Sequence, residues 1–440
     1  MKQPSDKIYD LAGIGIGPSN LSVAALLQPL EGEYSSIFFD QKPEFRWHPG
    51  MLFPEATLQV SFLKDLVSLV DPTNPYSFLA YLRSQKRLYH FLNAQFAKIK
   101  RREFNAYFSW VCEQLDNLHF NTKVTAVTYK DGLFHITAGD QVIRARNFSL
   151  GCGLTPAVPP FAQSHRGKQV FHGVHYLDAA PNVAGKRVAI IGGGQSGAEI
   201  LYHLVLDDDR LPKSIHWVSQ REYFSPIDDS PFTNDYFTPP YSDYFFGLPN
   251  HEKQNLIQQQ TLFSDGIEGG TLTNIYQRLY ELRHLGGRKN FCHLLPGVEC
   301  TTMSRKEDFF SLHLKKGDHQ MPITADFVIL ATGFSFAIPR FLDSLLPFIH
   351  MAEDKFVIRK DFSLKWTNSE RNSIFLLNGA RHVRGVADPN LSLLAWRSAT
   401  IINSLVGREV YDLADEACPF DFKAMENGAE AASLPSIQIV

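Results

Sequence analysis

The sequence has few cysteines, and no two of them have the spacing of a metal or redox motif. The five are Cys112, Cys152, Cys292, Cys300 and Cys418. An odd number at such wide spacing argues against a disulfide framework and a zinc site, and it is typical of a reducing compartment. An NADPH-dependent disulfide reductase is excluded as well, because it needs a redox CxxC pair. We therefore expect a cytoplasmic protein without a bound metal.

The sequence also lacks a large net charge of either sign, and it lacks a long apolar run. Lys and Arg number 43 against 46 Asp and Glu, which gives a formal net charge of −3 and a pI near 6.6. Nucleic-acid-binding domains usually carry a basic patch, which this balance argues against. No uninterrupted apolar stretch approaches the roughly 18 residues of a membrane span. We expect neither nucleic acid nor a membrane span.

The chain nevertheless has enough apolar residues to bury a core. Hydrophobic residues make up 44% of the sequence and charged residues 20%, which excludes a disordered protein. At roughly 150 residues per domain, 440 residues predict two or three lobes.

An apolar run near the N-terminus leads directly into a glycine turn. Residues 8–14 predict a buried strand and residues 21–27 a helix, and between them stands Gly15-Ile16-Gly17-Pro18-Ser19-Asn20. This order opens a dinucleotide-binding βαβ unit, in which glycines admit a pyrophosphate and the helix N-terminus supplies free N–H groups. The next predicted strand ends in Asp40, which would accept a ribose hydroxyl. The alternative is a strand–turn–helix without a ligand. The predicted cofactor ligands are Gly15, Gly17, Pro18, Ser19, Asn20 and Asp40.

A second pattern of the same kind begins at residue 186. After an apolar strand, Gly192-Gly193-Gly194-Gln195-Ser196-Gly197 matches the GxGxxG fingerprint in full. The following strand ends in Ser219-Gln220-Arg221, without the acid that an NAD site carries. A hydroxyl and a guanidinium suit a ribose 2′-phosphate, so NADPH is expected here; alternatively, Arg221 is a solvated loop charge. The predicted ligands are Gly192, Gly194, Gln195, Ser196, Gly197, Ser219 and Arg221.

Two nucleotide sites in one chain are typical of flavoprotein reductases and monooxygenases, with FAD first and NADPH second. A predicted strand at residues 326–330 leads into a turn containing Thr332 and Gly333, and such a turn often returns the chain to the flavin domain. Thr332 and Gly333 are therefore also predicted cofactor ligands. We expect an α/β fold with two Rossmann-like domains. The predicted FAD domain is discontinuous, at 1–165 and 330–440, and the inserted NADPH domain spans 166–329, with part of the substrate region at about 225–300.

The stretch at residues 45–78 is more specific than either glycine turn. It contains Phe45-Arg46-Trp47-His48-Pro49-Gly50-Met51, Gln59-Val60-Ser61-Phe62-Leu63-Lys64-Asp65-Leu66 and Asp71-Pro72-Thr73-Asn74-Pro75-Tyr76-Ser77-Phe78. Residues 229–234 and 388–392 add two further motifs, and Asn20 stands at the third glycine. Over nearly the whole chain, these motifs resemble the microbial N-hydroxylating flavin monooxygenases of siderophore biosynthesis, which act on lysine, ornithine or diamines.

The resemblance implies FAD and NADPH as cofactors and a primary amine and O2 as substrates. NADPH would reduce the flavin, oxygen would add to give a C4a-hydroperoxyflavin, and a neutral amine would attack the distal oxygen. It also implies a homo-oligomer, a tetramer. A Baeyer–Villiger relative would share both turns but lacks the motif at 59–65, and a flavin-free nucleotide sensor is the remaining alternative.

The resemblance also assigns roles to individual residues. Gln59 would lie near the flavin ring, with a core amide as the alternative. Lys64 would bind a substrate carboxylate, or else pair with Asp65. Asn234 would match an asparagine that holds the amino-acid end of ornithine, or form a turn, and Ser392 would lie near the reacting amine, or cap a helix. Leu391 would line the substrate site, and Trp47 and His48 would pack near the flavin.

Two departures from the ornithine enzymes bear on the substrate. Residues 263–267 replace an Asn-Tyr-Ser stretch, and Val383-Arg384-Gly385 replaces Thr-His-Gly. Residues 384–392 look most like the diamine hydroxylases. We therefore predict N-hydroxylation of putrescine or cadaverine for a hydroxamate siderophore; L-lysine N6-hydroxylation, L-ornithine N5-hydroxylation or another amine such as histamine are the alternatives.

Overall fold

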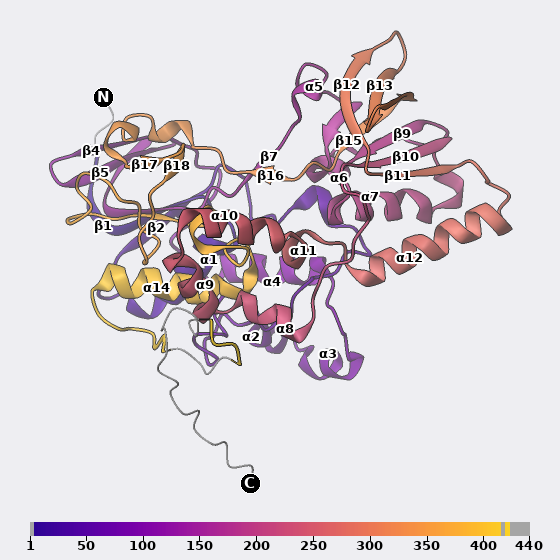
Figure 1. Cartoon of the computed structure of the whole chain (residues 1–440). Helices are drawn as coiled ribbons and strands as arrows, with labels where there is room; N and C mark the ends of the chain where they lie inside the picture. Colours follow the sequence, from indigo (N-terminus) through magenta and orange to yellow (C-terminus); the bar gives the residue numbers. More distant parts are fainter. Residues whose placement is uncertain (1–3, 415–418, 423–440) are drawn as a thin grey trace, which may run out of the picture.

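The computed structural model describes residues 4–414 and 419–422. Figure 1 shows two lobes joined by connectors at β7 (Thr155–Pro156) and β16 (Phe334–Ser335), which pair with each other. Each lobe contains a sheet with helices on it, which confirms the predicted α/β class. Within the described residues, no helix is long and apolar enough to cross a membrane.

The first lobe is organised by a seven-stranded sheet of order β3-β2-β1-β6-β5-β4, with β19 added on β6. β1 is parallel to both β2 and β6, and the late strand β19 is parallel to β6. Helices α1 (Pro18–Leu27) and α14 (Leu394–Val406) pack on each other beside it. The strands are β1 (Pro4–Ile14), β2 (Ser36–Phe39), β3 (Leu118–His119), β4 (Val124–Lys130), β5 (Leu133–Ala138), β6 (Gln141–Leu150) and β19 (Ile374–Leu376).

The second lobe has a five-stranded parallel sheet of order β11-β10-β9-β15-β8. One face carries α7 (Gln195–Leu206) and α12 (Gly269–Tyr280). The other face packs on an antiparallel sheet of β12 (Glu299–Arg305), β13 (Phe310–Lys316) and β14 (His319–Ala325). The parallel strands are β8 (Val170–His172), β9 (Arg187–Ile191), β10 (Ser214–Ser219), β11 (Cys292–Pro296) and β15 (Phe327–Leu330).

Four short helices between β10 and β11 reach from the second lobe toward the first (Figure 1). They are α8 (Pro231–Asn234), α9 (Pro239–Gly247), α10 (Asn250–Gln259) and α11 (Thr261–Asp265). Asp243 of α9 forms an ion pair at 2.7 Å with Arg384, the last residue of α13 (Arg381–Arg384). The helices α2 (Phe78–Ser84), α3 (Leu88–Ala94) and α4 (Arg101–Glu113) complete the first lobe.

The two sheets use separate parts of the chain. The first uses residues 4–150 and 374–376, and the second uses residues 170–330. The predicted domain bounds, and the assignment of one nucleotide to each lobe, stay predictions.

Candidate active site

The first glycine turn lies where β1 ends and α1 begins. Gly15 has φ +90°, a backbone region that side chains disfavour, and a Cβ there would lie 2.5 Å from the carbonyl oxygen of Gly151. A Cβ on Gly17, the N-cap of α1, would meet only that same oxygen, at 3.9 Å. Space therefore remains in front of the helix N-terminus, as a bound pyrophosphate requires.

Asn20 supports this turn from behind. Its side chain is fully buried, and Nδ2 donates to the carbonyl oxygen of Gly15 at 2.7 Å. Its Oδ1 accepts a hydrogen bond from Ser149 Oγ of β6 at 2.6 Å. A side chain on Gly151 would collide with the Asn20 amide, so this glycine makes room for the asparagine. Sequence reasoning missed both contacts, because it treated Asn20 as part of the turn alone.

Asp40 braces the same turn from the end of β2. Its Oδ2 accepts from the backbone N–H of Ile16 and its Oδ1 from that of Lys42, both at 2.8 Å. Each carboxylate oxygen can accept a second hydrogen bond, so a ribose hydroxyl can still be accommodated. That role stays a prediction.

The second glycine turn is equally tight. Gly192 has φ +128°, and a Cβ there would collide with the carbonyl oxygen of Ala331. A Cβ on Gly193 would collide with Ser219 Oγ, so the end of β10 lies directly against the turn. Gly194 caps α7, whose first two residues are Gln195 and Ser196, and a Cβ on Gly197 would collide with the turn itself.

Ser219 and Arg221 lie together beside this turn. Ser219 Oγ accepts from the backbone N–H of Arg221 at 3.0 Å. Arg221 Nη1 donates to the carbonyl oxygen of Asp265, the last residue of α11, at 2.6 Å. The Ser219 hydroxyl is thus bonded to the backbone of Arg221, whereas the guanidinium is held by the end of α11, and their binding of a 2′-phosphate stays a prediction.

Thr332 and Gly333 connect the two crossing segments. Thr332 Oγ1 donates to the carbonyl oxygen of Ala157 at 2.5 Å, and the N–H of Ala157 donates to Gly333 at 2.9 Å. His172 also contacts the Gly333 carbonyl, at 3.0 Å. Their contacts are therefore structural, and their predicted cofactor role stays a prediction.

Trp47 and His48 stand at the edge of the first lobe. The Trp47 ring lies 5.4 Å from that of Phe108, and the exposed His48 has left-handed φ +49° and lies 6.3 Å from the Phe334 ring. Desolvation, with smaller effects from Arg101 and Lys42, lowers the pKa of His48 to about 4. At this pKa the imidazole is neutral near pH 7.

Three side-chain amides have a buried atom without a hydrogen-bond partner among the described residues. The atoms are Nε2 of Gln59, Oδ1 of Asn378 and Oδ1 of Asn117, and Asn117 is bonded through Nδ2 to Ser36, at the end of β2 away from the glycine turn. Asn378 has φ +57° and follows β19, the strand beside β6. A flavin ring offers hydrogen-bond donors and acceptors that suit the free amide atoms of Gln59 and Asn378. Sequence reasoning missed Asn378; the available signal was Asn-Gly directly after an apolar strand.

Lys64 is half-buried and has no ion pair or side-chain hydrogen bond within residues 4–414 and 419–422. Desolvation lowers its pKa. The alternative of pairing with Asp65 is wrong. Asp65 points away and accepts the N–H groups of Val67, Ser68 and Phe78 at 2.7 to 2.9 Å.

Asn234 and Ser392 belong to segments that contribute to one small core cluster. Phe237, three residues after Asn234, and Leu393, next to Ser392, are both buried in it. The polar contacts of both are local: Asn234 Nδ2 donates to Asp229 at 3.2 Å, and Ser392 Oγ donates to Asn390 Oδ1 at 2.8 Å. Leu391 is half-buried at the start of the same short helix.

Arg384, one of the departures in the sequence, is buried in an aromatic cage. Its guanidinium lies 4.5 Å from the rings of both Phe246 and Phe362 and 5.7 Å from Trp396. It is 1% exposed and pairs with Asp243. Arg384 therefore fixes α9 against the segment that leads to Ser392.

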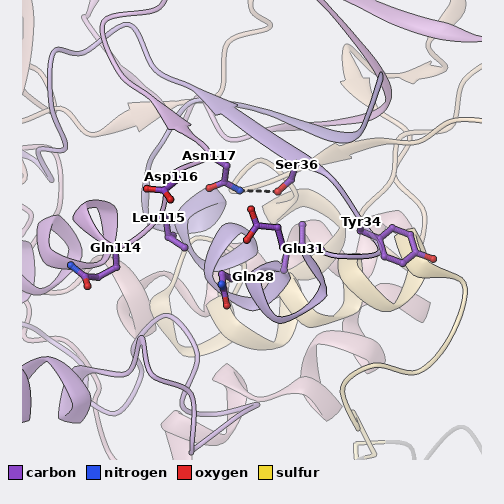
Figure 2. A pocket seen from close by; sticks show the side chains of 9 residues that line it. Gln28, Glu31, Tyr34, Ser36, Gln114, Leu115, Asp116 and Asn117 are labelled. Atoms are coloured by element: carbon purple, nitrogen blue, oxygen red, sulfur yellow. Dashed lines mark hydrogen bonds between the residues drawn. The ribbon is translucent and has the colours of Figure 1, made fainter. Parts of the chain in front are cut away.

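The small cavity in Figure 2 does not belong to this site. It has a volume of about 60 Å³ and is lined by Gln28, Glu31, Ser36 and Asn117. Ser36 begins β2, whereas the glycine turn and Asp40 lie at the opposite end of the sheet. A nucleotide does not fit in this volume.

Comparisons with known proteins agree over most of the chain. A sequence model of the family described as L-lysine 6-monooxygenase/L-ornithine 5-monooxygenase matches residues 7–336. An L-lysine N6-monooxygenase of Escherichia coli is 39% identical over 93% of this chain and 97% of its own. A putrescine N-hydroxylase of Acinetobacter baumannii is 34% identical over 92% of each chain. A crystal structure of an FAD-bound cadaverine monooxygenase from Erwinia amylovora superposes with a TM-score of 0.88, at 30% identity over 99% of this chain and all of that one.

Proposed function

The chain belongs to the L-lysine 6-monooxygenase/L-ornithine 5-monooxygenase family, and on that premise we propose that it hydroxylates a terminal amine of putrescine or cadaverine. The resemblance inferred from the sequence is thereby confirmed. The enzyme is a flavin-dependent N-monooxygenase with FAD and NADPH as cofactors. When bound, they supply the reduction and activation of O2 that oxygenate the amine.

The substrate proposal rests on relatives that act on diamines. One is named for putrescine and one for cadaverine, and each is at least 30% identical over more than nine-tenths of the chain. The replacement of the ornithine-type motif by residues 263–267 supports the same choice. The product would be an N-hydroxylated diamine, a precursor for a hydroxamate siderophore.

The protein residues would bind and orient the two cofactors. Gly15 and Gly17 leave room for the FAD pyrophosphate, and the open amide groups of Gln59 and Asn378 suit the flavin ring. Ser219 and Arg221 would hold the 2′-phosphate of NADPH. Asn234, Leu391 and Ser392 would line the amine site.

L-Lysine is the second candidate, and one observation favours it. Lys64 lacks an acidic partner among the described residues, so it is available to the carboxylate of an amino-acid substrate. A diamine would instead place a second cation near it, although the lowered pKa of Lys64 weakens that repulsion. The E. coli lysine enzyme is also more similar in sequence than the diamine relatives named here.

The deciding experiment compares amines with the FAD-loaded enzyme. Hydroxylamine formed per NADPH oxidised is measured with putrescine, cadaverine, lysine, ornithine and histamine, and hydrogen peroxide is measured in parallel. We expect the highest coupling with a diamine. Higher coupling with lysine would replace the diamine proposal by the lysine one.

The same assay tests the protonation state of the substrate. The attacking amine must be neutral, while a free alkylamine has a pKa near ~10.4, so coupling should rise between about pH 7 and 9. Coupling that stays level would mean that loss of the proton is not limiting.

We further propose a cytoplasmic homo-oligomer, a tetramer by family resemblance. Sedimentation equilibrium of the FAD-loaded protein should give a mass four times the 49.8 kDa of one chain. A monomer mass in sedimentation equilibrium would overturn the tetramer. Recovery of the protein in a periplasmic cell fraction would overturn the cytoplasmic location.

A further inference from the structure

An apolar joint connects the two lobes. Met51 and Phe53, from the motif-rich part of the first lobe, are 5% and 1% exposed and belong to the core of the second. The Phe53 ring lies 5.5 Å from that of Tyr176 and 4.7 Å from that of His203. Apolar contacts are not directional, so this joint holds the lobes together without fixing their angle.

A directional contact crosses the same joint. Arg101, the first residue of α4, forms two parallel hydrogen bonds with Glu199 of α7, at 2.6 and 3.1 Å. The side chains are only 14% and 7% exposed. A two-pronged pair between guanidinium and carboxylate fixes geometry as well as distance. Lys98 also pairs with Glu268 and Asp229, at the longer distances of 3.2 and 3.4 Å. A second short ion pair between the chain segments of the two lobes joins Asp243 of α9 to Arg384, at 2.7 Å.

Both partners of this pair also hold a segment of a cofactor site. Arg101 Nη1 donates to the carbonyl oxygen of Met51 at 3.0 Å, in the loop that follows Trp47 and His48. Gln195 Nε2, at the second glycine turn, donates to Glu199 Oε1 at 2.9 Å. A continuous set of hydrogen bonds therefore runs from the loop after Trp47 and His48 to the second glycine turn.

Packing beside the pair is incomplete. A cavity of about 420 Å³ lies between the lobes and is lined by Phe53, Lys98, Glu199, Tyr202 and Glu268 among others. Because side chains do not fill this space, the orientation of the lobes depends more on the specific bonds that span it.

We propose that the Arg101–Glu199 pair is a positioning device that aligns the NADPH turn with the flavin lobe for hydride transfer. The inference rests on the proposed function, because it presumes that NADPH reduces the bound flavin. Buried ion pairs contribute little net stability, and specifying one arrangement is their best-attested role. Misplacement of reactants by about 1 Å can slow a reaction roughly 100-fold.

The test is anaerobic stopped-flow reduction of the bound FAD by NADPH. It compares wild type with Arg101→Gln, Glu199→Gln and the double variant. We expect each single change to slow the limiting rate by roughly 10- to 100-fold, with a much smaller effect on the half-saturating NADPH concentration. Since the two residues act as one unit, the double variant should be no slower than the slower single variant.

The matched control is a pair inside the second lobe. Arg187 and Asp326 form two bonds of 2.6 and 3.1 Å, so Asp326→Asn breaks the same geometry without touching the joint. Its reduction rate should equal that of wild type. FAD content and thermal unfolding show whether each variant is folded, and Arg101→Lys replaces Arg101→Gln if the latter is not.

Two results would overturn the inference. One is that the flavin of Glu199→Gln is reduced at the wild-type rate. The other is that the fold-decrease of the reduction rate in the double variant equals the product of the fold-decreases in the two single variants. Failure of NADPH to reduce the wild-type flavin would instead contradict the proposed function.

Discussion

Asn20 and Ser149 are hydrogen-bonded at 2.6 Å, and this bond connects the start of α1 with the end of β6. A dinucleotide-binding turn usually has a third glycine at this place, which allows helix and strand to pack closely. Here Asn20 connects helix and strand through hydrogen bonds of its side chain, where a glycine would allow them to pack closely. Gly151 has no side chain and so leaves space for the Asn20 amide. The departure at the third glycine is therefore compensated within the same sheet.

Asn20→Ala should lower both stability and FAD content. The change leaves Ser149 Oγ without its buried acceptor, and such losses cost about 1–3 kcal/mol. Urea unfolding and the absorbance of bound flavin per chain would measure the two effects. Asn93→Ala, at an exposed asparagine of α3, is the matched control and should change neither. Normal flavin content and stability in Asn20→Ala would show that the turn does not depend on this bond.

Arg221→Ala should raise the Michaelis constant for NADPH far more than that for NADH. Loss of one charge-assisted hydrogen bond is worth ~1.5–3 kcal/mol, or roughly 10- to 150-fold. Steady-state oxidation of NADPH and of NADH measures the ratio of the two Michaelis constants. Arg283→Ala, an exposed arginine of the same lobe, should leave it unchanged. Equal effects on the two nucleotides would mean that Arg221 does not contact the 2′-phosphate.

The strands and turns could be predicted from the sequence because their signals are local. An apolar run, a glycine turn and a helix occupy some 20 neighbouring residues, so both βαβ units were recognised. The same pattern predicts that the strands of each unit are parallel. It does not predict the order of the strands within each sheet.

Contacts between distant segments could not be predicted in this way. Ser149 lies 129 positions from Asn20, and Glu199 lies 98 from Arg101. Nothing near either residue indicates its partner, because the sheets bring them together. The Lys64 side chain shows the same limit, since its neighbour Asp65 was the obvious partner and instead binds three backbone N–H groups.

His216 should make the folded state sensitive to acid. Its ring is stacked at 4.7 Å on His293, and desolvation and then that neighbour lower its pKa from 6.5 to about 4. Between these two pKa values the unfolded chain binds more protons than the folded one, so the folded state loses stability as the pH falls. The contribution of His216 to stability is therefore full above pH 6.5 and is lost as the pH falls toward 4. His216→Phe keeps the stacking without the titration.

Urea unfolding at two pH values would measure this effect. The loss of stability between about pH 7 and pH 5 should be smaller in His216→Phe than in wild type by on the order of 1–2 kcal/mol. His313→Phe, at an exposed histidine of the same lobe, should keep the wild-type difference. An unchanged difference in His216→Phe would show that this imidazole does not control acid stability.

Lys64→Ala separates the two candidate substrates, because the side chain has no described partner whose loss would complicate the result. A diamine has no carboxylate for Lys64 to bind, so its half-saturating concentration should change little or fall. For lysine, loss of the partner of a partly buried carboxylate should cost on the order of 2–5 kcal/mol, roughly 30-fold or more. NADPH oxidation should continue, with hydrogen peroxide formed in place of product. Lys168→Ala, an exposed lysine, is the control. A large loss with putrescine and cadaverine would contradict the expectation that Lys64 makes no contact with a diamine.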